Sequence, residues 1–254
     1  MANMGSQGIL KYIDNPANSI VSATEGSTVT WAVSSDTNDT AIVRAVAAGK
    51  GLHYAGALYA TDNNLIEFCS NNLYFTAQEG HCSVEAIIQL STMVDVAFNF
   101  GFNDDVLDAG NTLPMELTGT TISATATAFV GLIYDDDSTD PDNIYCAWVN
   151  GGTVGQTDSA GQIGGQDIKM DGVVPTAAKW FYMKVDLDDR GSGNGARATF
   201  LVVDHNGVSK ERTFDTTITR STPLCFYLGV ENRDALARNL YIRCPGWEQT
   251  IPDM

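Results

Sequence analysis

Apolar residues alternate with small or polar ones in many short segments of this chain, a pattern that favours β-strands. In "VDVAFNFGFND", residues 94–104, apolar residues recur at every second position. Successive side chains of a β-strand point to opposite faces, so a strand here would place one set of side chains in a core. The expected members of that set are Val94, Val96, Phe98, Phe100 and Phe102.

Helical periodicity is weak by comparison, and no stretch shows three or more clean turns. The best candidate is "NDTAIVRAVAAGKG", residues 38–51, which would form two or three turns at most, with Asn38 or Asp39 as the cap. The chain is rich in Val, Ile, Thr, Phe, Tyr and Gly, a composition that favours strands and turns. We therefore expect an all-β protein.

Turn residues divide the chain into regularly spaced expected strands. These are 27–33, 51–61, 64–70, 72–78, 81–90, 94–104, 128–135, 143–150, 179–189, 196–204, 207–215, 222–232 and 238–247. Residues 105–127 and the glycine-rich segment 151–175 are expected loops, and long loops are commonly functional or interface elements. Without a linker or repeat, the pattern predicts one antiparallel two-sheet jelly-roll sandwich over 25–254, clearest over 81–245, after an extended N-terminal arm at 1–24.

The charge balance, 14 − 31 = −17, indicates a strongly acidic surface. Such a surface repels nucleic-acid phosphates and anionic lipid headgroups, so neither nucleic acid nor a membrane is an expected partner. The start of the chain, "MANMGSQGILKYIDNP", lacks the basic and apolar regions of a secretory signal. No apolar run reaches the ~20 residues that span a bilayer.

The cysteines lie within or beside apolar segments and show neither a CxxC motif nor a Cys/His pair with metal-ligand spacing. They are Cys69, Cys82, Cys146, Cys225 and Cys244. We expect small buried side chains in a reduced compartment rather than zinc ligands or disulfides. This favours folding in a cytoplasm.

An acidic cluster separates the apolar segments 128–134 and 144–149. The cluster does not match an EF-hand loop that starts at Asp135. Such a loop requires Gly at its sixth position and Glu at its twelfth, and these positions hold Asp140 and Cys146. A looser calcium site from Asp135, Asp137, Asp140 and the Asn143 carbonyl is the alternative. Because Asp, Asn, Ser and Pro also favour exposed turns, we interpret the cluster first as a solvated hairpin tip without cofactor.

Catalytic patterns are missing from the sequence. β-Sandwich glycosidases place carboxylates at alternate positions of one strand, as E-x-D-x-(x)-E, and no glutamate here has such partners. Asp186 and Asp188 share a strand face, which we interpret as solvated. There is no nucleophile elbow, Walker loop or dinucleotide-binding glycine motif, and the three histidines lie far apart. We expect no catalytic residues and no enzyme.

Most aromatic residues lie inside alternating segments, where core packing is their ordinary role. They include Trp31, Trp148, Trp180, Tyr145, Tyr182 and Tyr227. Trp247, in "CPGWEQ" at the end of the last strand pattern, is the one expected to contact a partner.

From residue 81 onward, four segments occur in an order that resembles concanavalin A-like (laminin G-like) jelly-roll domains, particularly those of tailed-bacteriophage structural proteins. The segments are "SVEAIIQLSTMVDVAFNFGFNDD", "GTTISATATAFVGLIYDDD", "KWFYMKVDLDDRGSGNGARATFLVVDHNG" and "TPLCFYLGVENRDALARNLYIRC". They cover about two-thirds of the chain as a pattern, and residues 1–80 match less clearly.

This resemblance implies a non-enzymatic virion protein, namely a capsid decoration (cement) protein on the capsid surface, assembled in the host cytoplasm. Its partners would be the major capsid protein and its own copies, for example in a trimer. The expected interface elements are the arm from Met1 to Asp14, with Met1, Leu10, Tyr12 and Ile13, then the 151–175 loop and Trp247. The alternative is a carbohydrate-binding, lectin-like module of a phage tail or surface protein, with an exposed Trp or Tyr beside residues 135–143.

Overall fold

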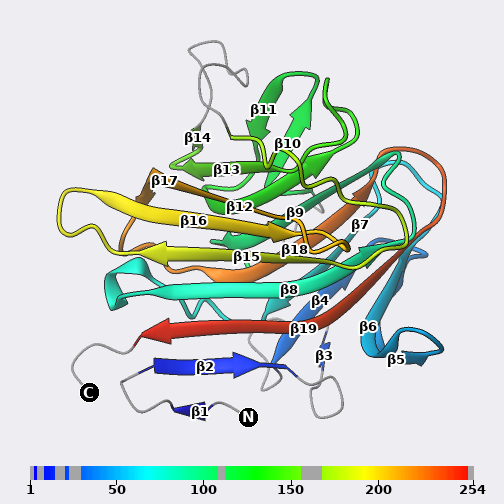
Figure 1. Ribbon diagram of the computed structural model, residues 1–254, viewed down its shortest axis with the longest axis horizontal. Helices are drawn as coiled ribbons and strands as arrows, with labels where there is room; N and C mark the ends of the chain where they lie inside the picture. The colour runs from blue at the N-terminus through cyan, green and yellow to red at the C-terminus, as the bar shows by residue number, and fades with distance from the viewer. Residues whose placement is uncertain are drawn as a thin grey trace.

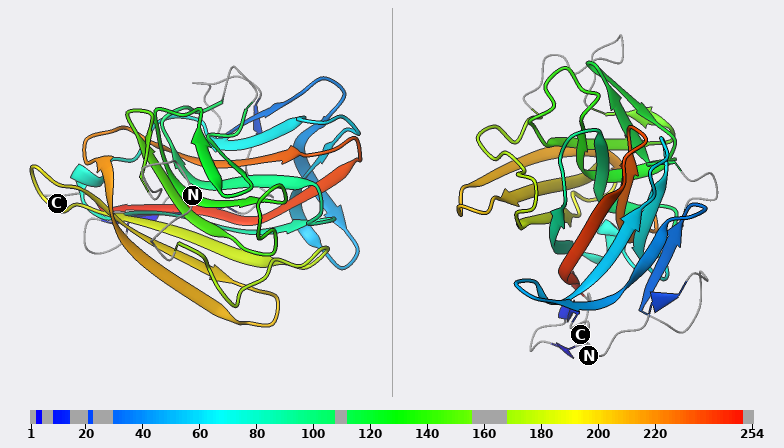
Figure 2. Two further views of the ribbon diagram at one scale, coloured as in Figure 1. Left: turned by 90° about the horizontal axis from the view of Figure 1, so that it is seen from above. Right: turned by 90° about the vertical axis from the view of Figure 1, so that its right-hand side faces the viewer.

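A computed structural model describes residues 3–4, 9–14, 21–22, 30–107, 112–155 and 168–250. These residues form strands and turns, with one short 3-10 helix, η1 (Ala77–Glu79). None of the described residues belongs to a helix long and apolar enough to cross a membrane. Two sheets lie face to face around one core (Figures 1 and 2). The predicted all-β, two-sheet sandwich is confirmed.

The nine-stranded sheet has the order β1-β2-β19-β8-β15-β16-β17, and β6 pairs with both β19 and β5. Its strands are β1 (Asn3–Met4), β2 (Ile9–Ile13), β5 (Thr40–Ala47), β6 (Gly51–Leu58), β8 (Cys82–Leu90), β15 (Phe181–Asp188), β16 (Gly195–Val203), β17 (Ser209–Thr219) and β19 (Arg238–Thr250). In Figure 1, β16, β15, β8, β19 and β2 lie side by side. The expected strands 179–189, 196–204 and 207–215 thus form an antiparallel meander.

The eight-stranded sheet has the order β14-β13-β12-β9-β18-β7-β4-β3. Its strands are β3 (Val21–Ser22), β4 (Trp31–Ser35), β7 (Leu65–Ser70), β9 (Val96–Asn103), β12 (Ala128–Asp135), β13 (Tyr145–Asn150), β14 (Thr153–Val154) and β18 (Cys225–Asn232). The pairing of β12 with β13 confirms the expected hairpin around the acidic cluster.

The core between the sheets is built from the alternating residues that the sequence pattern identifies. Phe98, Phe100 and Phe102 are fully buried, and Phe98 contacts Phe181 of the opposite sheet at a ring distance of 5.9 Å. Each such side chain stabilises the fold by about 1.5–3 kcal/mol through burial. The placement of Val94 on this face was wrong, because Val94 precedes β9 and is exposed.

The outer faces of the two sheets differ. Strands β9, β12 and β18 are buried at every position, whereas β15 alternates between buried and partly exposed residues. A small hairpin of β10 (Met115–Thr118) and β11 (Thr121–Ala124) covers the eight-stranded sheet, where Asn99 exchanges hydrogen bonds of 3.0 and 2.8 Å with the backbone of Met115. The outer face formed by β8, β15 and β19 is therefore the more open to solvent.

Three expected elements were wrong. No strand forms over 72–78, where η1 begins. Residues 38–51 do not form a helix; Thr40–Ala47 is strand β5, paired with β6, whose other edge pairs with β19. Ile42, Val43 and Val46 are β-branched, which suits a strand, and only Ile42 of β5 is buried. Residues 105–127 are not all loop, since they contain β10 and β11; their register opposes Met115 to Ala124 and Thr118 to Thr121.

None of the five cysteines, all of which belong to the described residues, forms a disulfide, and four of the five are buried. Burial raises the pKa of the Cys69 and Cys225 thiols well above its usual value, which keeps both protonated. The expectation that all five are buried was wrong for Cys244, which is exposed at a bulge of β19.

Gly131 faces Gly101 across β12 and β9, where the strands lie too close for a side chain. A Cβ on Gly131 would lie 2.3 Å from the Phe100 carbonyl oxygen and 2.5 Å from Cζ of Phe129. Gly131→Ala is expected to lower the free energy of unfolding by about 1–3 kcal/mol, because the backbone must shift. Urea unfolding measures the change. Gly151→Ala is the control, because no atom lies within 4 Å of its added Cβ and the substitution adds only backbone strain at a φ of 59°. If Gly131→Ala lowered the free energy of unfolding no more than Gly151→Ala does, the predicted clash would be contradicted.

Candidate functional site

The acidic hairpin does not gather its aspartates around one point. Asp135 ends β12, is only 2% exposed, and accepts hydrogen bonds on both carboxylate oxygens. Oδ1 accepts from Arg233 Nε (3.1 Å) and the Asp137 N–H (3.1 Å), and Oδ2 from Arg233 Nη2 (2.7 Å) and the Leu117 N–H (3.2 Å). Asp137 itself is exposed. The prediction of a solvated tip is therefore right for Asp137 and wrong for Asp135.

The third calcium candidate, Asp140, pairs with Lys169, and this hydrogen bond holds the pKa of the Asp140 carboxyl below its usual value. Asp135 is already saturated by a guanidinium and two N–H groups. Across the described residues, no group of three or more His, Cys, Asp or Glu could hold a metal ion. Calcium takes six to eight oxygen ligands, so Asp135, Asp137 and Asp140 as placed here do not fit that ion.

Arg233 joins Asp135 to Glu231 in a buried ion network beneath β10. Its Nη1 bonds to Glu231, and Glu116 Oε1 lies 3.8 Å from the same nitrogen. Burial, opposed by Arg233, raises the pKa of Glu231 to about 7. The side chains of Asp135, Glu231 and Arg233 are 2%, 3% and 8% exposed, so a substrate does not reach them. This network stabilises the hairpin rather than offering a reactive group.

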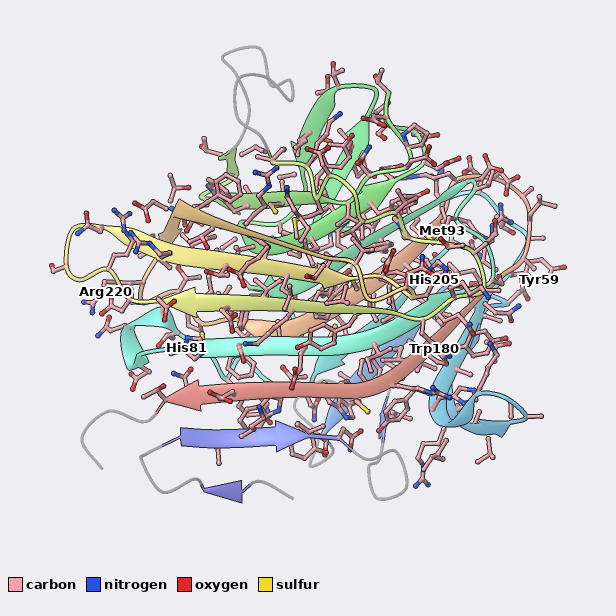
Figure 3. All side chains as sticks on the ribbon, in the orientation of Figure 1. Tyr59, His81, Met93, Trp180, His205 and Arg220 are labelled. Carbon is pink, nitrogen blue, oxygen red and sulfur yellow. The ribbon has the colours of Figure 1, made fainter. Side chains whose placement is uncertain are left out.

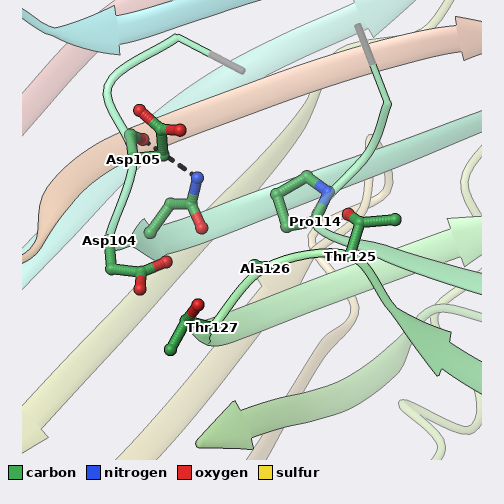
Figure 4. A pocket seen from close by; sticks show the side chains of 7 residues that line it. Asp104, Asp105, Pro114, Thr125, Ala126 and Thr127 are labelled. Carbon is green, nitrogen blue, oxygen red and sulfur yellow. Dashed lines mark hydrogen bonds between the residues drawn. The ribbon is translucent and has the colours of Figure 1, made fainter. Parts of the chain in front are cut away.

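A small pocket lies at the opposite end of β9, between residues 103–105 and the segment around Thr125 (Figure 4). It has a volume of about 170 Å³ and is lined by Asn103, Asp104, Asp105, Pro114, Thr125, Ala126 and Thr127. Burial raises the pKa of Asp104. Small-molecule sites typically enclose about 300–1,000 Å³, so this pocket is smaller than a typical ligand site.

The open face of the nine-stranded sheet carries a row of aromatic and polar side chains, which we call the outer strip. Its members are Lys50, His81, Glu85, Gln89, Trp180, Tyr182, Lys184, Asp186, Asp188, Tyr241 and Arg243. The register sets Tyr241 opposite Gln89, and Lys184 opposite Glu85. Alternate residues of three neighbouring strands, β19, β8 and β15, therefore point to the same face. His81 and Trp180 directly precede β8 and β15, and Lys50 belongs to the turn between β5 and β6. Trp180 and His81 lie toward opposite ends of this face (Figure 3).

The Trp180 end of the outer strip combines two aromatic rings with two cations. The Arg243 guanidinium carbon lies 4.2 Å from the ring centre of Trp180, and Lys50 Nζ lies 3.9 Å from that of Tyr241. Gln89 accepts a hydrogen bond from Lys50 and donates one of 2.5 Å to the Ala178 carbonyl. These contacts hold the two cations over rings that are themselves only partly buried.

The His81 end is acidic. His81 lies between two carboxylates, with Nδ1 2.9 Å from Asp188 and Nε2 3.5 Å from Asp186, and Lys184 lies 2.8 Å from Asp186. Burial raises the pKa of Asp186, while Lys184 and His81 oppose the shift. The interpretation of Asp186 and Asp188 as a solvated pair holds for the half-exposed Asp188 and is wrong for Asp186. His81 and Asp188 are 107 positions apart, so no local pattern could reveal the cluster.

The described part of the N-terminal arm is a strand of the chain's own sheet. β2 pairs with β19, so that Tyr12 opposes Trp247 and their rings stack at 5.7 Å. Asp14 is buried and accepts hydrogen bonds from Tyr12 (2.8 Å), Trp31 (2.9 Å) and Tyr54. Of the predicted interface residues, Tyr12 and much of Trp247 pack within the chain, Leu10 is half-buried and Ile13 is exposed. Met1 lies outside the described residues.

The glycine-rich segment 151–175, predicted as an interface loop, is described at 151–155 and 168–175. Ile168, Met170 and Val173 are buried in the core. The Ile168 carbonyl accepts from the Cys146 N–H at 2.8 Å, and the Met170 N–H donates to Ile144 at 2.9 Å. These flanks therefore belong to the sandwich, and the prediction for residues 156–167 lies outside the described part.

Several solved structures have a similar fold. A protein of unknown function from Shewanella oneidensis MR-1 gives a TM-score of 0.59 at 10% identity over 100% of this chain and 92% of that chain. Peanut lectin gives 0.57 at 12% identity, over 97% and 99% of the two chains. A PL-14 alginate lyase from the marine Aplysia kurodai gives 0.52 at 6% identity, over 82% and 87%. In sequence, no protein-family model and no curated protein matches the chain.

These similarities show that the chain has the concanavalin A-like lectin/glucanase β-sandwich fold, as the resemblance predicted. At identities of 6–12% they establish the fold alone. The similar structures include both a lectin and a lyase, so function has to be argued from the outer strip and its chemistry.

Proposed function

We propose that the chain is a non-enzymatic carbohydrate-binding protein that holds a glycan along the outer strip. The observation that carries this proposal is the row formed by Tyr182 and Tyr241 with polar groups on neighbouring strands, with Trp180 beside Arg243 at one end. A sugar ring has apolar C–H faces, which aromatic rings cover, and hydroxyl groups, which amides and carboxylates bind. The open face of the nine-stranded sheet offers both kinds of contact in one row.

The states of the carboxylates favour binding over catalysis. Glycoside hydrolysis requires two carboxyl groups on either side of the scissile bond, one of them protonated at working pH. Glu231 has a suitably raised pKa, but its side chain is buried and paired with Arg233. Asp186, whose pKa is also raised, is engaged by Lys184 and His81. Glycan binding does not require a protonated carboxyl group. The similarity to a structure named as a lectin also supports a binding function.

Trp180→Ala is expected to reduce glycan binding by at least about tenfold, because it removes the largest aromatic surface of the outer strip. A glycan array with the unaltered protein would identify ligands, and calorimetry would compare the two proteins. Tyr59→Ala is the matched control, since Tyr59 is an exposed aromatic residue outside the strip.

The glycan array tests the proposed function, and the comparison of the two variants tests the location of the site. Equal losses in Trp180→Ala and Tyr59→Ala would contradict the location of the site, and an array without hits would contradict the function. Because Asp135 is saturated by Arg233, binding is expected to survive removal of calcium by EDTA. Loss of binding in EDTA would move the site to the acidic hairpin.

Capsid decoration stays a prediction, as do the major capsid protein as partner and the virion as location. The comparisons identify the fold alone. The N-terminal segment, on which the predicted subunit contact depended, uses β2 to pair with β19 of the same chain.

A further inference from the structure

Two cations lie side by side on the outer strip of a chain with a net charge of −17. Lys50 comes from the turn between β5 and β6, and Arg243 from β19. Neither has a carboxylate within 4.0 Å among the described residues, whereas Lys184 pairs with Asp186 in the same strip and Lys11 with Glu248 nearby. In so acidic a protein, a pair of cations without a counter-ion points to a ligand that supplies one.

The positions of these cations are held by the fold. Gly51 follows Lys50, and a Cβ at Gly51 would lie 3.7 Å from Arg243 Nη2, so the turn brings the lysine beside the guanidinium. Trp180 contacts both cations, with Lys50 Nζ 5.7 Å and the Arg243 carbon 4.2 Å from its ring centre. The proximity has an electrostatic consequence: burial, and secondly the charge of Arg243, lowers the pKa of Lys50. An anion between the two groups would relieve their repulsion.

The other end of the strip limits how much negative charge a ligand can carry. Glu85, Asp186 and Asp188 lie there, and Glu85 is already bound by the Tyr182 hydroxyl at 2.5 Å. A densely charged polyanion laid along β8 would meet these carboxylates as well as the acidic surface beyond them. A ligand with one acidic group and a neutral remainder avoids this repulsion.

We propose that Lys50 and Arg243 form a subsite for the single acidic group, a carboxylate or a sulfate ester, of an otherwise neutral glycan. The acidic group sits at the Trp180 end, and the neutral sugars extend across Tyr182 toward His81. The guanidinium presents paired N–H donors to the anion, and the lysine adds a point charge. This inference rests on the proposed function and specifies its ligand class.

The test compares tetrasaccharides of one backbone that are neutral, carry one terminal uronate, or carry one terminal sulfate, together with heparin as a dense polyanion. The backbone is taken from the strongest array hit. Lys50→Gln and Arg243→Gln are each expected to weaken binding of the acidic tetrasaccharide about tenfold, and binding of the neutral one much less. Lys11→Gln removes the same charge from β2, outside the strip, and is expected to change neither. Thermal unfolding of each variant checks that it is folded.

The outcomes separate this inference from the function on which it rests. A preference for the uronate or sulfate that Lys50→Gln and Arg243→Gln abolish would support the subsite, and the two ligands show which acid it takes. Neutral glycans bound through Trp180 with no effect of either cation would overturn the subsite and leave the proposed function intact. Heparin as the tightest ligand would overturn the single-charge inference. Failure of every glycan to bind would remove both proposals.

Discussion

Arg233→Met is expected to lower the free energy of unfolding by about 3–5 kcal/mol at pH 8. The substitution keeps an apolar stem but leaves two carboxylates, Asp135 and Glu231, buried without their cation. An unpaired buried charge loses its hydration and gains nothing in return, so it is either strained or protonated. Asp135 would also lose two of its four hydrogen bonds.

Urea unfolding followed by tryptophan fluorescence measures this effect. Arg197→Met is the matched control, because Arg197 pairs with Asp215 at 2.8 Å on the surface, with both side chains about half exposed. Exposed pairs contribute about 0–1 kcal/mol, so the control is expected to stay near the stability of the unaltered protein. If both variants lost the same small amount, the buried network would not hold the hairpin.

Glu231→Gln is expected to become more stable than the unaltered protein as the pH rises from about 4.5 to about 7. Glu231 titrates near 7 in the folded state, against a usual value of 4.5, because burial disfavours its charged form. A raised folded pKa gives stability that is fully present below 4.5 and is lost as the pH rises through 7. The neutral glutamine does not titrate and keeps the fold of the protonated form.

The expected difference between the two proteins is near zero at pH 4 and about 3 kcal/mol at pH 8, from a shift of roughly 2.5 pH units at 1.36 kcal/mol each. Urea unfolding midpoints of both proteins across this pH range measure the difference in stability. The two proteins share all their other carboxylates, so the titration of those groups cancels when one stability is subtracted from the other. Glu211→Gln, at an exposed position of β17, serves as control and is expected to show no such slope. A pH-independent difference for Glu231→Gln would mean that Arg233 keeps the carboxylate ionised.

The buried network and the outer strip have opposite roles in this fold. Beneath the β10–β11 hairpin, which covers the eight-stranded sheet, the buried charges are paired with one another, and Asp135 binds the hairpin through the Leu117 N–H. On the uncovered sheet, Lys50 and Arg243 lack carboxylate partners among the described residues and lie beside half-buried rings. Ligand binding is therefore expected on the face where the chain has not satisfied its own charges.

The sequence alone determined the features that depend on neighbouring residues. Alternation in 96–102 is enough to assign Phe98, Phe100 and Phe102 to the core, because each strand residue points away from the next. The acidic turn between two apolar runs likewise predicts the β12–β13 hairpin. The order of such segments also carried the resemblance to the concanavalin A-like fold.

Which faces are covered, and which charges meet, depends on contacts between segments that are distant in the chain. Residues 40–47 form β5 as one half of a hairpin with β6, and β6 in turn pairs with β19, which lies 180–188 positions further along the chain (Leu58 opposite Arg238, Tyr54 opposite Ile242). Arg233 reaches Asp135 across 98 positions, and His81 reaches Asp188 across 107. Lys50 and Arg243 likewise meet over Trp180, although they are far apart in the chain. The backbone hydrogen bonds that join strands can be made by any sequence, so they do not by themselves specify which strands pair. The order of the strands in a sheet is selected by the packing of the whole core.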